Sequence, residues 1–221
     1  MNINQLPNLS IISSIVILIV VLTLVWRFIS NRRSLPCPSW LSWMVEMDNP
    51  FTKTNRASVI IDLLGLQPGM KVLDAGCGPG RLAIPAAKAI GLQGELTALD
   101  IQAGMLARVQ EKARTAGLSN IRLMQVELGK GKLEMAYYDR AMLVTVLGEI
   151  PEQEAALQEI YQALKPGGIL SVTEVIFDPH FQSRESVQRV AGRVGFREAG
   201  FFGKRLAYTM HFEKNRMIAG S

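Results

Sequence analysis

The chain has 221 residues and a formal net charge of +5; 48% of its residues are hydrophobic and 19% are charged. This balance supports a folded core and excludes an intrinsically disordered protein. Two cysteines, Cys37 and Cys77, are too few for a zinc site. The positive charge comes from residues 181–216, which carry eight basic and three acidic residues. We interpret this region either as a solvated helix face or as a surface for anionic lipid, and we expect no nucleic-acid partner.

The first predicted element is an apolar segment. Residues 1–26 contain no ionisable side chain, and Leu9–Ile29 would span roughly 30 Å as a helix, about the thickness of the hydrocarbon core of a bilayer. A cleaved signal peptide would need a basic start and a small-residue cleavage site, and a buried core helix would show some polar face. Arginines follow the segment, so the positive-inside rule places the rest of the chain in the cytoplasm. The sequence therefore predicts a single-pass membrane protein with residues 1–30 as its anchor.

Residues 31–50 are rich in proline, serine and tryptophan, which indicates a linker that becomes a short amphipathic element. Its apolar residues fall at helical spacing and form one face, made of Trp40, Trp43, Met44 and Met47. That face would pack on the following domain, lie at a membrane interface or border a substrate entrance. We predict a catalytic domain over residues 51–216 and a short tail at 217–221.

Helices and strands alternate from residue 51 onward. The apolar periodicity predicts helices at 54–66, from the glycine stretch to 89, around 105–113, at 152–164 and at 183–194. Strands are predicted at 70–75, 95–100, 120–128, 138–147, 169–176, 196–202 and 206–213. A turn at 165–168 separates the fourth helix from the fifth strand. Pro85 is unfavourable inside a helix, so the first helix after the glycines is expected to begin late enough to hold it in its first turn.

The order of these elements indicates the fold class. The first five strands are near-continuous apolar runs, which is typical of a parallel sheet covered by helices on both faces. The last two strands have only a short connection, which requires an antiparallel hairpin. The sequence therefore predicts a doubly wound, mostly parallel seven-stranded α/β sheet that ends in an antiparallel hairpin.

The first strand leads into a glycine-rich loop, 72-VLDAGCGPG-80. Gly76, Gly78 and Gly80 permit a sharp turn and let a ligand approach the backbone without a Cβ in the way. Asp74 precedes the loop, and Asp100 closes the second strand, where a carboxylate can accept hydrogen bonds from ribose hydroxyls. The G-x-G-x-G spacing differs from the G-x-G-x-x-G of dinucleotide-binding loops, so the pattern favours a different nucleotide cofactor.

These motifs, together with ALD at Asp100, YDRAMLVTVLGEIP, LKPGGILSVTE and the final hairpin, resemble the class I S-adenosylmethionine-dependent methyltransferases over about residues 51–214. The resemblance implies a Rossmann-like methyltransferase fold and S-adenosylmethionine as cofactor. It also implies cofactor-binding positions: the loop Gly76–Gly80, including Cys77, against the methionine part, Asp74 near the ammonium group, Asp100 on the ribose hydroxyls and Ile101 against the adenine. A third acid normally follows strand three, and Glu127 is the nearest candidate.

Methyl transfer from a sulfonium needs alignment more than acid–base chemistry, so catalytic residues leave a weak sequence signal. The loops after the fourth and fifth strands offer Glu149, Asp178 and His180. His180 is the candidate general base, against a packing role, and Glu149 a candidate substrate or cofactor contact, against a helix cap. His211 is expected to be structural, and no metal is expected.

The sequence hypothesis is a membrane-anchored methyltransferase acting at the cytoplasmic leaflet on a small apolar or amphiphilic acceptor. A lipid headgroup amine, a quinone or isoprenoid hydroxyl and a small thiol all fit. One alternative is a non-catalytic cofactor-binding or scaffold protein. A second is a nicotinamide-dependent reductase, against which the loop spacing, the hairpin and the lack of a Tyr-x-x-x-Lys pair all count.

Overall fold

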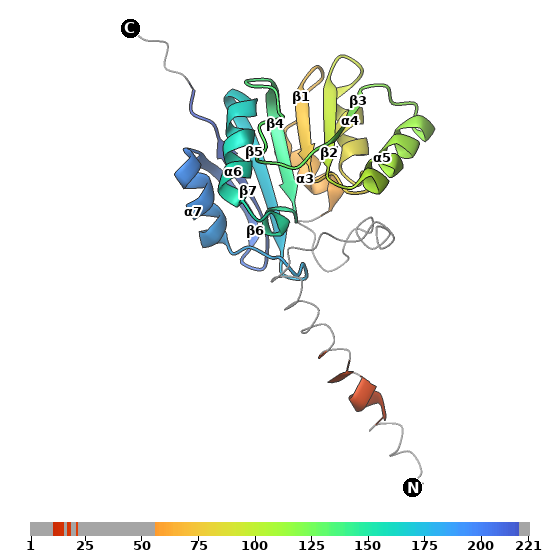
Figure 1. Cartoon of the computed structure of the whole chain (residues 1–221), viewed down its shortest axis with the longest axis vertical. Coiled ribbons are helices and arrows are strands. Elements are labelled where there is room, and N and C mark those ends of the chain that lie inside the picture. Colours follow the sequence, from red (N-terminus) through yellow and green to blue (C-terminus); the bar gives the residue numbers. More distant parts are fainter. Residues whose placement is uncertain (1–10, 16, 19–20, 22–55, 217–221) are drawn as a thin grey trace.

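The computed structural model describes residues 11–15, 17–18, 21 and 56–216. Seven strands in this part of the chain form one sheet in the order β3-β2-β1-β4-β5-β7-β6 (Figure 1). Strands β1 to β5 run parallel to one another, whereas β7 is antiparallel to both β5 and β6. The predicted parallel sheet with a terminal antiparallel hairpin is therefore confirmed.

Each predicted strand and helix from residue 57 onward is present, with ends that differ by a few residues. The strands are β1 (Lys71–Ala75), β2 (Glu95–Asp100), β3 (Ile121–Gln125), β4 (Tyr138–Val144), β5 (Leu164–Val175), β6 (Arg197–Lys204) and β7 (Ala207–Glu213). The helices are α3 (Ala57–Leu64), α4 (Ala83–Ile90), α5 (Ala103–Thr115), the 3-10 turn η4 (Leu147–Glu149), α6 (Gln153–Ala163) and α7 (Arg184–Val194). Pro85 is the third residue of α4, where a missing N–H leaves no hydrogen bond unmade.

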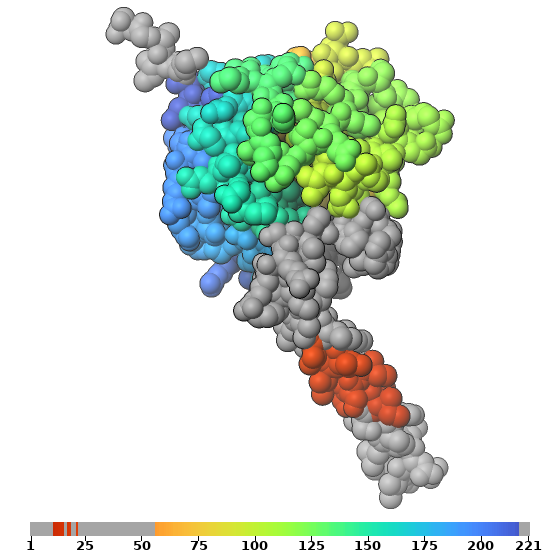
Figure 2. All heavy atoms as spheres, viewed as in Figure 1, coloured from red at the N-terminus to blue at the C-terminus, as the bar shows by residue number. Residues whose placement is uncertain are grey.

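The sheet is buried on both faces because neighbouring residues of its central strands point to opposite sides. Val72 on β1 packs with the side chains of α3, α4 and α5, whereas its neighbour Leu73 belongs to the cluster that contains α6 and α7. Both residues are fully buried. The space-filling view shows α7, α6 and the segment after α5 side by side, from blue through teal to green, over one face (Figure 2). This two-sided cover explains why the strands appear in the sequence as continuous apolar runs.

One local prediction differs from the structure. The predicted turn at residues 165–168 lies inside β5, which begins directly after α6. Tyr138 pairs with Leu164, but Arg140 pairs with Ile169, so β5 carries a bulge opposite β4. Gly167 has a φ of 77°, which a glycine adopts without strain. The Lys-Pro-Gly-Gly run thus shapes a bulge in a paired strand rather than a separate turn.

The membrane prediction requires correction. No helix in the described part of the chain is long and apolar enough to cross a membrane. The predicted single-pass membrane location is therefore wrong on this finding. Most of residues 1–30, the linker at 31–50 and the tail at 217–221 lie outside the described residues.

The basic residues near the C-terminus do not form an unpaired stretch. Several of them pair with acids on other elements: Arg184 lies 3.0 Å from Glu198, and Arg197 pairs with Glu213. Lys214 donates to the carbonyl of Leu164 at 2.6 Å. The ion pairs of these basic residues therefore connect α7 to β6 and β6 to β7.

Candidate active site

The glycine loop lies at the carboxyl ends of β1 and β2, where ligands bind in open parallel sheets. The amides of Gly76 and Cys77 both donate to the Leu99 carbonyl, at 2.8 and 2.9 Å. Gly76, Gly78 and Gly80 all have positive φ, which favours glycine at each position. A Cβ on Gly76 would lie 2.6 Å from the methyl groups of Val146, so the loop also packs tightly against the segment after β4.

Asp100 organises this loop from the end of β2. One carboxylate oxygen accepts the Gly78 amide at 3.0 Å and the other accepts the Gln102 amide at 2.9 Å. Burial raises the pKa of Asp100, and these backbone hydrogen bonds oppose that shift. With a further backbone hydrogen bond from Ile101, three of the four lone pairs of the carboxylate are used, so Asp100 can hold the loop and still accept a ligand hydroxyl.

Asp74 is the most conspicuous polar group beneath the loop. It is 3% exposed, and its Oδ2 has no hydrogen-bond partner among the described residues. Burial raises the pKa of Asp74 to about 7, although the positive charge of Arg81 opposes the shift. A buried carboxyl oxygen without a partner is costly in the free protein. The unpartnered oxygen of Asp74 is therefore suited to accept a hydrogen bond from a cationic group of a ligand.

The other predicted cofactor residues lie in different environments. The side chain of Cys77 is buried in the cluster with α3, α4 and α5, where burial raises the pKa of its thiol, and its Sγ lies 3.5 Å from the Gly78 carbonyl of the loop. Ile101 is 49% exposed beside Asp100. Glu127 is exposed two residues beyond β3 and lies 3.5 Å from Lys130. The residue that ends β3 opposite Asp100 is Gln125, whose side-chain amide donates to the Ile101 carbonyl at 3.2 Å.

A second group of polar residues gathers at the ends of β4 and β5. The imidazole of His180 is 5% exposed, and its Nδ1 lies 3.9 Å from Oε1 of Glu149 and 3.9 Å from Oδ1 of Asp178. Neither ring nitrogen has a hydrogen-bond partner among the described residues. Asp178 also accepts the backbone amide of His180 at 2.7 Å. The structure thus brings together Glu149, Asp178 and His180, the three residues that the sequence analysis named in these loops.

The electrostatics of this group are dominated by buried acids. Burial, with the nearby charges of Asp178 and Asp100, raises the pKa of Glu149 to about 8. Burial also raises the pKa of Glu174 to about 8; this carboxyl is 1% exposed and accepts the Gln182 amide at 3.1 Å. Sequence reasoning missed Glu174, because an acid inside an apolar strand is visible in the sequence but its burial is not. Such shifted carboxyls are typical of functional sites.

The turn after β4 links the two groups. Thr145 has a φ of 56°, which is strained for a β-branched residue, and its amide donates to the Thr173 carbonyl on β5 at 2.8 Å. Val146 packs against Gly76 of the glycine loop, and η4 carries Glu149 toward His180. A strained backbone such as that of Thr145 persists only where neighbouring contacts fix it. Here those contacts are made by the glycine loop on one side and by β5 on the other.

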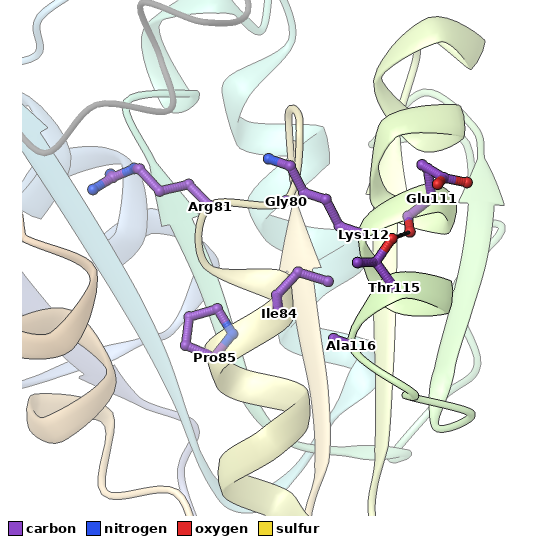
Figure 3. A pocket seen from close by; sticks show the side chains of 8 residues that line it. All are labelled: Gly80, Arg81, Ile84, Pro85, Glu111, Lys112, Thr115 and Ala116. Carbon is purple, nitrogen blue, oxygen red and sulfur yellow. Dashed lines mark hydrogen bonds between the residues drawn. The ribbon is translucent and has the colours of Figure 1, made fainter.

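A shallow cavity of about 500 Å³ lies elsewhere, on the flank between α4 and α5. Figure 3 shows the Arg81 side chain extending away from α5 and the Lys112 side chain reaching back toward the glycine loop. The cavity is lined by Gly80, Arg81, Ile84, Pro85, Glu111, Lys112, Thr115 and Ala116. It borders the end of the loop but contains none of the polar residues at the strand ends, so we place the candidate site at those ends.

Comparison with known proteins identifies the class of this domain. Residues 72–168 match the family model for "Methyltransferase domain". A demethylmenaquinone methyltransferase from Staphylococcus aureus is 34% identical over 122 residues, 55% of this chain and 49% of the relative. The ubiquinone/menaquinone biosynthesis C-methyltransferase UbiE from Vibrio vulnificus is 32% identical over 123 residues, 54% of this chain and 47% of the relative. The chain therefore spans about half the length of the curated relatives it matches.

Solved structures match the fold more widely. A SAM-dependent methyltransferase from Aquifex aeolicus aligns with a TM-score of 0.72 at 20% identity, covering 81% of this chain and 100% of that one. The [4+2]-cyclase SpnF aligns with a TM-score of 0.66 at 19% identity, over 72% and 80% of the two chains. At these identities the likeness shows the Rossmann-like methyltransferase fold alone, and the cyclase shows that this fold is not confined to one chemistry. With the matched domain, the predicted enzyme class and cofactor agree with the comparisons.

Proposed function

We propose that the chain is an S-adenosylmethionine-dependent methyltransferase that methylates a ring carbon of a reduced quinone. The observation that carries the proposal is the position of His180, buried beside two carboxyl groups at the carboxyl ends of the parallel strands, where the glycine loop also lies. The names of the two curated relatives supply the acceptor class. Of the acceptors that the sequence left open, a phenolic ring is the one that needs a base most directly.

The residues at the first strand end fit the cofactor. The unpartnered Oδ2 of Asp74 would accept from its ammonium group, and the glycine loop lets its methionine part approach the backbone. Asp100 has a lone pair left for a ribose hydroxyl, and Ile101 offers an exposed apolar side chain for the adenine. When bound, S-adenosylmethionine supplies an electrophilic methyl group and leaves as S-adenosylhomocysteine. Glu127 and Gln125 are alternative contacts for the far end of the adenine.

The second strand end would prepare the acceptor. His180 takes the proton from a ring hydroxyl, which moves electron density onto the neighbouring ring carbon that forms the new bond. Glu149 and Asp178 lie on the Nδ1 side of the imidazole, and an ionised carboxylate at either position stabilises the imidazolium that results. The ring carbon then loses its hydrogen as a proton, and the ring oxygen takes back a proton from the imidazolium, which restores the hydroxyl and the neutral His180. In total the acceptor exchanges one proton for one methyl group, and no oxidant or reductant is consumed.

The acceptor class is tested with the full chain and three acceptors: a demethylated naphthoquinol kept reduced, a long-chain primary amine and a small thiol. We expect S-adenosylhomocysteine to form with the quinol and not with the other two. The oxidised quinone should be inert, because it has no hydroxyl proton for His180 to accept. Turnover of the amine or the thiol in preference to the quinol would reject the acceptor class.

The role of His180 is tested with His180→Gln. Loss of a general base should lower kcat with the quinol by about 100-fold or more and leave cofactor affinity unchanged. His211→Gln is the matched control, since His211 lies on β7 and burial with the charge of Arg140 lowers its pKa to about 4. Full activity of His180→Gln would exclude base catalysis by this residue.

A further inference from the structure

We propose that Gly148 and Tyr208 are positioning residues that hold His180 in the acceptor site from two sides. This inference rests on the proposed function, since it assigns a task to His180. It concerns residues that do not touch the reacting atoms and that act through the placement of one loop, residues 178–182.

The first side is η4. A Cβ built on Gly148 would overlap the carbonyl oxygen of His180 and lie 2.8 Å from both its carbonyl carbon and its Cβ. Gly148 is not among the glycines with positive φ, so its backbone conformation does not itself require glycine. The requirement comes from contact: the two backbones pack directly on each other, which only glycine permits. The same turn carries Glu149, so one contact sets both the loop and the carboxylate beside the imidazole.

The second side is the end of β7. The hydroxyl of the buried Tyr208 donates to the carbonyl of Gln182 at 2.7 Å. Glu174, the residue that pairs with Tyr208 across β5 and β7, accepts the Gln182 amide at 3.1 Å. The peptide groups on both sides of Gln182 are thus fixed to the sheet two residues beyond His180. The Phe181 ring also packs on the Tyr208 ring, with centroids 6.2 Å apart.

These contacts explain how an imidazole can be kept in place without a hydrogen bond to its own ring. Both ring nitrogens lack partners among the described residues, and the Glu149 and Asp178 oxygens are 3.9 Å away. The ring orientation is therefore set by the backbone of the loop rather than by a fixed partner. This leaves Nε2, the ring nitrogen for which no carboxylate contact is present among the described residues, available to an acceptor, and it makes the position of His180 sensitive to any shift of the loop.

The test uses Gly148→Ala, which adds one methyl group, and Tyr208→Phe, which removes one hydroxyl. The matched controls are Gly192→Ala on α7, where an added Cβ meets nothing within 4 Å, and Tyr161→Phe on α6, which removes a hydroxyl remote from the loop. The first readout is independent of turnover: the rate at which diethyl pyrocarbonate modifies His180, followed by peptide mass spectrometry. The chain has only two histidines, so His211 serves as an internal reference.

We expect both test variants to raise the His180 modification rate and to lower kcat by about 10- to 100-fold, with KM for S-adenosylmethionine unchanged. The controls should match the parent protein in both measurements. In a His180→Gln background the two substitutions should cause no further loss of kcat, because their effect acts through His180.

Three results would overturn the inference: a His180 modification rate equal to that of the controls, a loss of kcat that persists undiminished in the His180→Gln background, or a rise in KM for S-adenosylmethionine with kcat unchanged. If Gly148→Ala does not fold, Tyr208→Phe still decides the matter, since it adds no atoms. If the parent protein transfers no methyl group at all, the proposed function fails, whereas the modification rates still decide whether these residues hold His180.

Discussion

At the residue scale, Asp74 combines a structural cost with a proposed role in binding the cofactor. Its carboxyl is buried with an unpartnered oxygen, and burial raises its pKa to about 7. An acid whose pKa is higher in the folded than in the unfolded state binds more protons when folded, so stability falls as pH rises toward the folded pKa. We therefore expect Asp74 to destabilise the ligand-free protein above neutrality and to regain that loss in the complex.

The substitution Asp74→Asn tests both the loss of stability in the ligand-free protein and the contribution to cofactor binding. The free energy of unfolding of the variant relative to the parent should increase by about 1.4 kcal/mol between pH 6 and pH 8, since one pKa unit corresponds to that energy. Affinity for S-adenosylmethionine should fall by about tenfold or more, because a charge-assisted hydrogen bond is lost. Urea unfolding at the two pH values and calorimetric titration measure the two effects. A constant stability difference at both pH values would show that Asp74 does not titrate in this range.

The positions of candidate site residues were predictable from the sequence where local spacing fixes them. Asp74 and Asp100 stand at fixed offsets from the glycines, and the structure places both beside the loop. Glu127 was chosen by residue type, whereas β3 ends two residues earlier at Gln125. Glu174 and Tyr208 were missed because their importance comes from burial and from a contact with residue 182, which the sequence does not show.

At the element scale, Glu159 of α6 fixes the loop that follows β3. Its carboxylate is 7% exposed and accepts the backbone amides of Gly129, Lys132 and Leu133. The carboxylate thus accepts hydrogen bonds from three backbone amides of a loop that belongs to no helix or strand. This loop connects the carboxyl end of β3, which lies beside Asp100, to the start of β4. Glu159 of α6 therefore fixes a segment that begins next to the candidate site.

Glu159→Gln should lower the free energy of unfolding by about 2 kcal/mol, since one carboxylate oxygen is replaced by an amide group that cannot accept from the loop. Glu154→Gln on the same helix is the control: Glu154 is exposed and lies 3.7 Å from Arg193, so its loss should change stability by less than about 0.5 kcal/mol. Urea unfolding compares the two. Equal effects would mean that the loop does not depend on Glu159.

The identity and order of the elements were predictable because apolar periodicity, caps and glycines act over short distances. Ser183, which caps α7 by accepting the Ser186 amide, is an example. The bulge at Lys165–Gly168 was not predictable, because the same four residues suit a free turn and only the pairing of β5 with β4 makes them part of a strand.

At the scale of the whole molecule, three buried carboxyls make the ligand-free domain sensitive to pH. Burial raises the pKa of Asp74 to about 7 and those of Glu149 and Glu174 to about 8. Between pH 6.5 and pH 8 the folded state therefore holds more protons at these positions, and stability should fall as pH rises. His211, whose pKa is lowered to about 4 in the folded state, is neutral when folded but about half protonated when unfolded at pH 6.5, so it adds a small opposing rise in stability over the lower part of this range.

We expect the Tm of the ligand-free protein to decrease from pH 6.5 to pH 8, and this decrease to become smaller with saturating S-adenosylmethionine, which supplies a cation near Asp74. Differential scanning calorimetry with and without the cofactor measures both slopes. A Tm that rises over this range would show that the carboxyls are ionised at little cost.

The glycine loop follows β1 and the His180 loop follows β5, and these strands are parallel, so both loops lie at the carboxyl ends of the strands. This shared location is the basis of the proposed chemistry. The most direct test uses S-adenosylmethionine with a trideuterated methyl group, the full chain and a reduced demethylnaphthoquinol, with mass and NMR analysis of the product. We predict that the label appears on a ring carbon, with one S-adenosylhomocysteine formed per labelled product. Label on oxygen, or no label despite cofactor binding, would contradict the account.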